Sequence, residues 1–160
     1  MQPSVTARFP PIETVHSSRT IRSLFLAISI LSAAGLVLSA VSLQRHYAKS
    51  ATSYCDFGQQ FNCDIVNRSE YSSIIGIPVA AIGVAGYGAL IALSVRYRAQ
   101  SRTALRLLIA STLGLAFALY LTYIEAYVLT TWCVLCLISL GLISLITVLA
   151  ALSTKASKRQ

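Results

Sequence analysis

Residues 133–152 read CVLCLISLGLISLITVLAAL, an apolar run without a charged residue that opens on a Cys-x-x-Cys pair. A helix rises about 1.5 Å per residue, so a run of this length can cross a hydrocarbon layer of about 30 Å. Three other stretches are also apolar and of comparable length: residues 23–43 and 76–95, which carry no charged residue, and 107–131, whose one charged residue is Glu125. The sequence therefore predicts an all-α membrane protein with four transmembrane helices.

The composition agrees with a membrane protein and excludes two other classes. The chain has 160 residues, of which 56% are hydrophobic and 11% charged, and its mean hydropathy is +0.70. Soluble domains carry about 25% charged residues, and a small domain has too little interior to bury so many apolar side chains. Disorder requires low hydrophobicity. The net charge of +8 is compatible with nucleic acid, but no basic stripe is interleaved with aromatic residues, so we expect no nucleic-acid partner.

The basic residues predict the orientation. Those outside the segment 44–75 are Arg8, Arg19, Arg22, Arg96, Arg98, Arg102, Arg106, Lys155, Lys158 and Arg159. The positive-inside rule places these residues, and with them both termini, in the cytosol. We therefore expect a multi-pass protein of the cell (inner) membrane, with a disordered cytosolic tail at 1–22, a four-helix domain at 23–152, an outer loop at 44–75 within it, and a basic cytosolic tail at 153–160.

All four cysteines fall on the outer side in this topology. Cys55 and Cys63 lie in the outer loop, and Cys133 and Cys136 begin the fourth apolar run. Disulfides persist in the oxidising compartment outside a bacterial cell. Gly58 lets the loop bend, so a disulfide closing it is sterically feasible. Residues three apart share a helix face, and a helix N-terminus favours a thiolate, so Cys133 and Cys136 form a candidate redox pair.

A zinc site and a static staple are the competing interpretations of these cysteines. A single Cys-x-x-Cys is only half of a four-cysteine zinc site, and Cys55 and Cys63 do not supply a second one. His16 and His46 lack ligand spacing, so we expect no metal. Four cysteines allow three pairings. A redox relay would pass through more than one of these pairings in turn, whereas a structural disulfide would keep a single pairing.

The cysteines belong to a wider set of matching features. They are the loop pair Cys55 and Cys63, the run Cys63-Asp-Ile-Val-Asn-Arg-Ser69, the segment Gly76-Ile-Pro-Val-Ala, Tyr87, and the pair Cys133 and Cys136. As a set they resemble the vitamin K epoxide reductase family in its bacterial form, from about residue 24 to residue 152. The resemblance implies a four-helix bundle around a quinone, either ubiquinone or menaquinone, with the outer loop folded over the site.

The resemblance also implies a function. Electrons would pass from the dithiol of an exported thioredoxin-fold partner, through Cys55 and Cys63, to Cys133 and Cys136 and on to the quinone, which supports disulfide formation in exported proteins. Cys55 would meet the partner and Cys136 the quinone. The chain ends in a short basic tail, so we expect the partner to be a separate protein. Leu140 stands where the animal enzymes have a tyrosine, which favours a quinone over vitamin K epoxide as the acceptor.

Three further residues are candidates for the quinone site. Ser69 would hydrogen-bond a quinone oxygen, or else cap a turn. Trp132 would stack on the quinone ring, or else belong to an interfacial aromatic belt. Glu125, an acid within the third apolar run, would relay a proton or position the loop. Its alternatives are a carboxylate that reaches interfacial water or one that is bonded to a neighbouring helix.

Two other functions compete with this one. The first is a reductase of quinone or quinone epoxide whose purpose is the reduced quinone, with the same sulfur chemistry. The second is a non-enzymatic membrane scaffold stapled by disulfides, whose pairing would not change with redox state.

Overall fold

The computed structural model describes residues 12–48, 61–96 and 101–158. Cys55 lies outside the described residues. The elements, in chain order, are α1 (Ile12–Tyr47), α2 (Cys63–Arg68), the short helix η2 (Glu70–Ser72), the strands β1 (Ser73–Ile74) and β2 (Ile77–Pro78), α3 (Val79–Arg96), α4 (Ser101–Ile124), the π-helical turn η3 (Glu125–Leu129) and α5 (Val134–Lys158).

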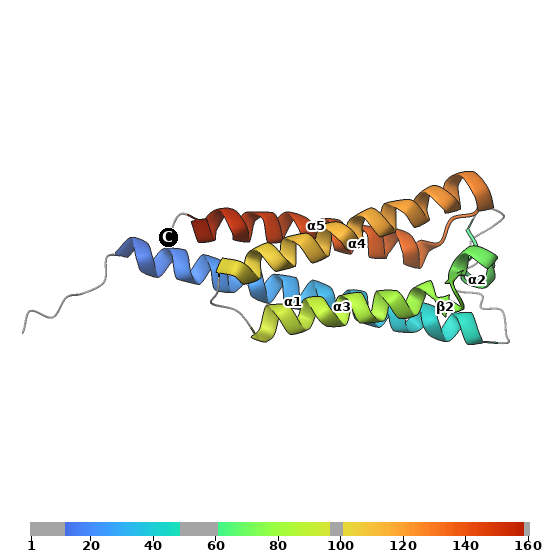
Figure 1. The fold of residues 1–160 in the computed structure, drawn as a ribbon, viewed down its shortest axis with the longest axis horizontal. Coiled ribbons are helices and arrows are strands. Elements are labelled where there is room, and N and C mark those ends of the chain that lie inside the picture. The colour runs from blue at the N-terminus through green and yellow to red at the C-terminus, as the bar shows by residue number, and fades with distance from the viewer. Residues whose placement is uncertain (1–11, 49–60, 97–100, 159–160) are drawn as a thin grey trace, which may run out of the picture.

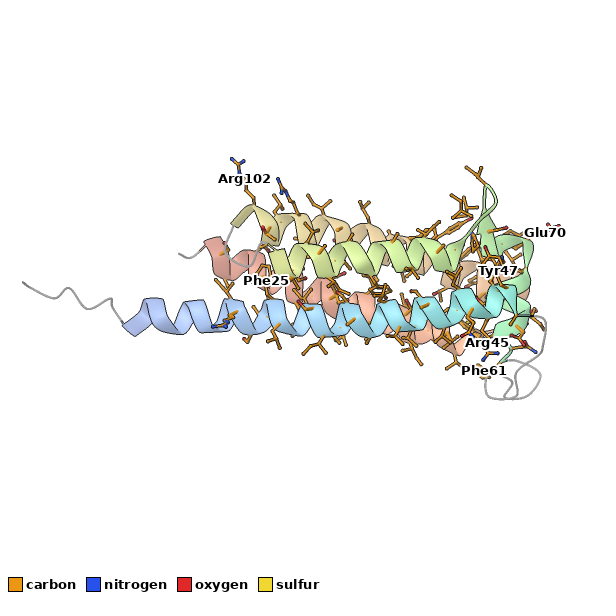
Figure 2. The ribbon with its side chains drawn as sticks, turned by 90° about the horizontal axis from the view of Figure 1, so that it is seen from below. Phe25, Arg45, Tyr47, Phe61, Glu70 and Arg102 are labelled. Carbon is orange, nitrogen blue, oxygen red and sulfur yellow. The ribbon has the colours of Figure 1, made fainter. Side chains whose placement is uncertain are left out.

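The four long helices form an elongated bundle. In Figure 1, α1 lies beside α3 and α4 lies beside α5. Helices α1 and α5 also pack extensively, and α3 and α4 contact each other less. The short elements α2, η2 and the β1–β2 hairpin cover one end of the bundle (Figure 1). Figure 2 shows Arg45, Phe61 and Glu70 at this covered end and Arg102 at the opposite end.

Within the described residues, three bundle helices are long and apolar enough to cross a membrane. They comprise residues Ile21–Tyr47, Arg102–Leu129 and Val134–Ser157. The apolar part of α3, Val79–Val95, is shorter. The prediction of a helical membrane protein is therefore supported for three spans, and the fourth span stays a prediction.

The helix boundaries differ from the predicted ones. Helix α1 begins at Ile12 rather than at residue 23, so residues 12–22 are helical, and the prediction of a disordered tail is wrong for them. The third predicted run likewise begins earlier, at Ser101, and its last part is the π-helical turn. An apolar run marks only the part of a helix that lipid or the core covers. Arginine is a good helix former, so a helix can continue past the end of the apolar run through such residues.

A buried tyrosine joins three of the helices. Tyr87 of α3 is 6% exposed, and its hydroxyl donates to the main-chain oxygen of Ser139 in α5 at 3.1 Å and lies 2.9 Å from the Ser139 Oγ. Its ring packs against Gly35 of α1, where a Cβ would lie closer than 3.0 Å to three ring atoms. The rest of the core extends toward the Arg102 end, where Figure 2 shows Phe25. Tyr87 therefore fixes the spacing of α1, α3 and α5.

Candidate redox site

The first turn of α2 is attached to the Cys-x-x-Cys segment by main-chain pairing. Asn62 caps α2, because its Oδ1 accepts the N–H groups of Asp64 at 3.0 Å and Ile65 at 3.1 Å. The N–H of Asn62 donates to the carbonyl oxygen of Trp132 at 3.2 Å, and Phe61 pairs with Trp132 in a parallel bridge. These bonds hold the start of α2 beside the residue that precedes Cys133.

Three of the four predicted cysteines come together at this junction. Cys63 is 1% exposed and Cys133 is fully buried, and the two belong to one buried cluster with Val66. Cys136 packs against that cluster. Cys63 is disulfide-bonded, whereas Cys133 and Cys136 carry free thiols. The junction therefore holds a disulfide-bonded cysteine of the loop next to a reduced Cys-x-x-Cys pair.

Glu125 lies against the same pair. Its side chain is 2% exposed, and its Oε2 accepts the N–H of Cys133 at 3.1 Å. A carboxylate oxygen of Glu125 and the two sulfurs of Cys133 and Cys136 all lie within 4.8 Å of one another. The alternative in which this carboxylate reaches interfacial water does not hold, because the side chain is buried against the segment that enters α5.

The local chain path explains this position. A π-helical turn is wider than an α-helical one. It ends at Thr130, which adopts the left-handed conformation (φ 47°) and whose N–H bonds the main-chain oxygen of Glu125. The N–H of Thr131 bonds the same oxygen at 3.3 Å. The chain thus turns back directly after η3 and brings Cys133 to the Glu125 carboxylate.

The same three side chains have the donor set of a thiophilic metal site. Thiolates and a carboxylate are ligands that zinc accepts, and the spacing of their ligand atoms is compatible with one ion. The expectation of no metal stays a prediction. The sequence does carry a signal for the approach of Glu125 to the cysteine pair: Glu125 is an acid in an apolar run, eight positions before Cys133.

A cavity of about 410 Å³ lies between the four long helices, beneath α2 and η2. Its volume falls within the range of sites for small organic ligands, about 300–1,000 Å³. Most of its wall is apolar, and Cys136 and Glu125 are part of it. Its other polar side chains come from α1, α3, α5 and the segment 66–72. They are Ser39, Ser42, His46, Asn67, Ser69, Tyr71, Ser72, Tyr87 and Ser139.

The polar side chains of α1 and α2 in this wall form a network around Asn67. The Ser42 Oγ donates to the Asn67 Oδ1 at 2.7 Å, and the His46 Nδ1 bonds the Asn67 main-chain oxygen at 2.6 Å. A carbonyl oxygen only accepts, so the Nδ1 of His46 carries the proton. The sequence gives no signal for this network. His46 has no ligand spacing, and the hydrogen bond between His46 and Asn67 joins residues that are 21 positions apart in the chain.

Of the three predicted quinone-binding residues, Cys136 and Ser69 line the cavity and Trp132 does not. Ser69 lines the cavity, but its Oγ donates to the main-chain oxygen of Val66 at 2.8 Å at the end of α2. Its hydroxyl proton is thereby used within the turn, and the oxygen retains only acceptor capacity. Trp132 contributes its main chain to the bridge with Phe61 and is not among the described residues that line the cavity. Both quinone contacts stay predictions.

Residues 26–151 match the Vitamin K epoxide reductase family in a comparison with protein-family models. The chain belongs to this family. No curated protein matches it significantly. The family is membrane-embedded and linked to quinones in general, and the predicted resemblance is confirmed over most of the chain. Membership in the family, together with the apolar helices, identifies the chain as a membrane oxidoreductase.

Proposed function

We propose that the protein is a quinone-dependent thiol:disulfide oxidoreductase that serves disulfide formation in exported proteins. Electrons pass from a separate, exported thioredoxin-fold protein to Cys55 and Cys63, then to Cys133 and Cys136, and finally to a membrane quinone. One observation carries the proposal: Cys63 and Cys133 share a buried cluster, and Cys136 belongs to the wall of the adjoining cavity.

The first transfer is an exchange of disulfides. The partner dithiol reduces a Cys55–Cys63 disulfide and becomes a disulfide itself. The Cys63 thiolate then attacks the Cys133 sulfur of the Cys133–Cys136 disulfide, forms a mixed disulfide and releases the Cys136 thiolate. Attack by Cys55 on Cys63 re-forms the loop disulfide and releases Cys133. The bonding of the cysteines, with Cys63 disulfide-bonded and Cys133 and Cys136 free, fits the state after this step.

The second transfer re-oxidises the Cys-x-x-Cys pair. A bound quinone supplies an acceptor for two electrons and two protons. Cys133 and Cys136 lose two electrons and two protons as they close their disulfide, so the exchange balances. Cys136 is the sulfur that lines the cavity, which supports its role as the quinone-reactive residue. Ser69 also lines the cavity and is retained as a contact of the bound ring: its oxygen, which already donates to Val66, can accept a hydrogen bond from a hydroxyl of the reduced quinone.

Glu125 is proposed as the group that holds a proton for this pair. Its carboxylate accepts the N–H of Cys133 and lies within 4.8 Å of both sulfurs. A carboxylate at that distance can take the thiol proton as a disulfide forms. The same hydrogen bond orients the main chain at Cys133, so the residue both positions the pair and serves its chemistry.

The proposed orientation places the cysteine end outside and both termini in the cytosol. Arg102 lies at the end opposite to α2 (Figure 2), and it is one of the basic residues outside the segment 44–75 that the positive-inside rule assigns to the cytosol. The cysteine end then faces the compartment in which an exported partner would act. No observation favours quinone epoxide as a substrate, and the free thiols of Cys133 and Cys136 give no support to a fully stapled scaffold.

Quinone reduction by the purified full chain tests the proposal. Protein in lipid nanodiscs, supplied with a membrane-impermeant dithiol and ubiquinone-1, should form quinol, which is followed by absorbance. Cys136→Ser should abolish the reaction. Ser144→Ala, on the same helix but with its hydroxyl bonded to its own helix and outside the cavity lining, is the matched control and should retain it. Full activity in Cys136→Ser would exclude the assignment.

A further inference from the structure

The side chain of Asn67 carries a hydrogen-bond donor that no described residue satisfies. The side chain is 8% exposed, and its residue lines the cavity. Its Nδ2 is buried and makes no hydrogen bond to any described residue. Native proteins pair nearly all of their buried polar groups, so an unpaired buried amide calls for a partner beyond the described residues. The adjoining cavity is where such a partner would lie.

The amide is held in one orientation by its neighbours. Ser42 of α1 donates to the Oδ1 of Asn67 at 2.7 Å, which leaves the Nδ2 as the free end of the amide. His46, one turn further along α1, donates to the main-chain oxygen of Asn67 at 2.6 Å. That oxygen lies in the last turn of α2, where helix carbonyls have no partner within the helix. Two bonds from α1 thus fix both the backbone and the side chain of Asn67.

The missing partner is a hydrogen-bond acceptor on a largely apolar molecule, because most of the cavity wall is apolar. We propose that the Asn67 amide donates a hydrogen bond to a carbonyl oxygen of the quinone, and thereby sets the ring in the cavity that Cys136 lines. This inference rests on the proposed function, which supplies the quinone. A donor at this oxygen also gains strength as negative charge develops there during reduction. Ser42 and His46 are positioning residues in this arrangement.

The test compares two ligands that differ only in their carbonyl groups. Duroquinone has two ring carbonyls and no free ring position for thiol addition, and durene is the same tetramethyl ring without them. Trp132 is the only tryptophan of the chain, so quenching of its fluorescence reports duroquinone binding to the full-length protein in detergent. Durene binding is measured by displacement of duroquinone. Partition into micelles cancels when variants are compared at the same detergent concentration.

The variant is Asn67→Leu, which keeps the size of the side chain and removes its polar atoms. We expect the preference for duroquinone over durene to fall about fivefold to tenfold, the effect of one lost hydrogen bond, with the affinity for durene unchanged. Ser42→Ala, which retains the donor but frees its orientation, should give a smaller loss. In turnover, the KM for duroquinone should rise in Asn67→Leu while the KM for the dithiol stays constant.

The outcomes separate this inference from the proposed function. If the unmodified protein neither binds nor reduces duroquinone, the proposed function itself fails. If it prefers duroquinone and Asn67→Leu retains the full preference, the function stands and the assignment of Asn67 is overturned. If Asn67→Leu loses both ligands, the cavity has been disturbed, and Asn67→Asp, which has the same shape without the amide donor, decides: a preserved preference overturns the assignment and a lost preference supports it.

Discussion

Replacement of Gly35 by alanine should be costly, because α1 approaches the Tyr87 ring at this glycine. The added Cβ would lie closer than 3.0 Å to the Cδ1, Cε1 and Cζ atoms of Tyr87. The ring is 6% exposed and its hydroxyl is held by Ser139, so a withdrawal from α1 toward the cavity would strain that hydrogen bond. Overpacking of this kind costs about 1–3 kcal/mol, and the gain in helix propensity, up to about 1 kcal/mol, offsets only part of it.

A double-mutant cycle isolates the cause. In a Tyr87→Leu background the ring is absent, so Gly35→Ala should lose most of its penalty, which gives a coupling of about 2 kcal/mol. The free energy of unfolding is measured by SDS titration of the detergent-solubilised protein. Gly141→Ala in α5, where an added Cβ meets nothing within 4 Å, is the matched control and should be neutral or stabilising. An equal penalty with and without Tyr87 would refute the steric argument.

Three further substitutions address the redox junction. Glu125→Gln keeps an acceptor for the Cys133 N–H but removes the base. The kcat of quinone reduction should therefore fall about a hundredfold, with the free energy of unfolding nearly unchanged. An unaltered kcat would remove Glu125 from the proton path. Thr130→Gly should raise the unfolding free energy by about 1 kcal/mol in the same SDS titration, because Thr130 adopts the left-handed conformation, and a loss of stability would contradict this. Asn62→Ala removes the cap of α2 and should cost about 1 kcal/mol. It should also slow reduction by a protein dithiol more than reduction by dithiothreitol, and equal effects on both rates would argue against a role for α2 in the relay.

The long helices can be predicted because their signal is local. An apolar run of about 20 residues reports the membrane-spanning part of a helix, and each of the four predicted runs falls largely within one long helix. The limits of the helices cannot be read from the same signal. Helix α1 continues to Ile12 through residues that are polar but compatible with a helix, and no apolar pattern distinguishes the π-helical turn at Glu125 from the α-helix before it.

The site is predictable where it depends on residue type and not where it depends on tertiary contact. Cysteines are rare and chemically distinct, so the sequence alone marks Cys63 and Cys133 as candidates, although their packing in one cluster does not follow from spacing. Glu125 stands out as an acid in an apolar run, but its bond to the Cys133 N–H depends on the turn at Thr130. Asn67 gives no such signal, because its role depends on contacts with α1.

The relay from Cys63 to Cys133 is the central claim, and trapping its mixed disulfide tests it most directly. In the variant with Cys55→Ser and Cys136→Ser, both resolving thiols are gone, and mild oxidation of membranes should link Cys63 to Cys133 almost completely, as detected by peptide mass spectrometry. The matched variant with Cys63→Ser and Cys136→Ser should form far less of a Cys55–Cys133 bond. If Cys63 and Cys133 both remain open to alkylation after oxidation, the proposed route of electrons through them is wrong.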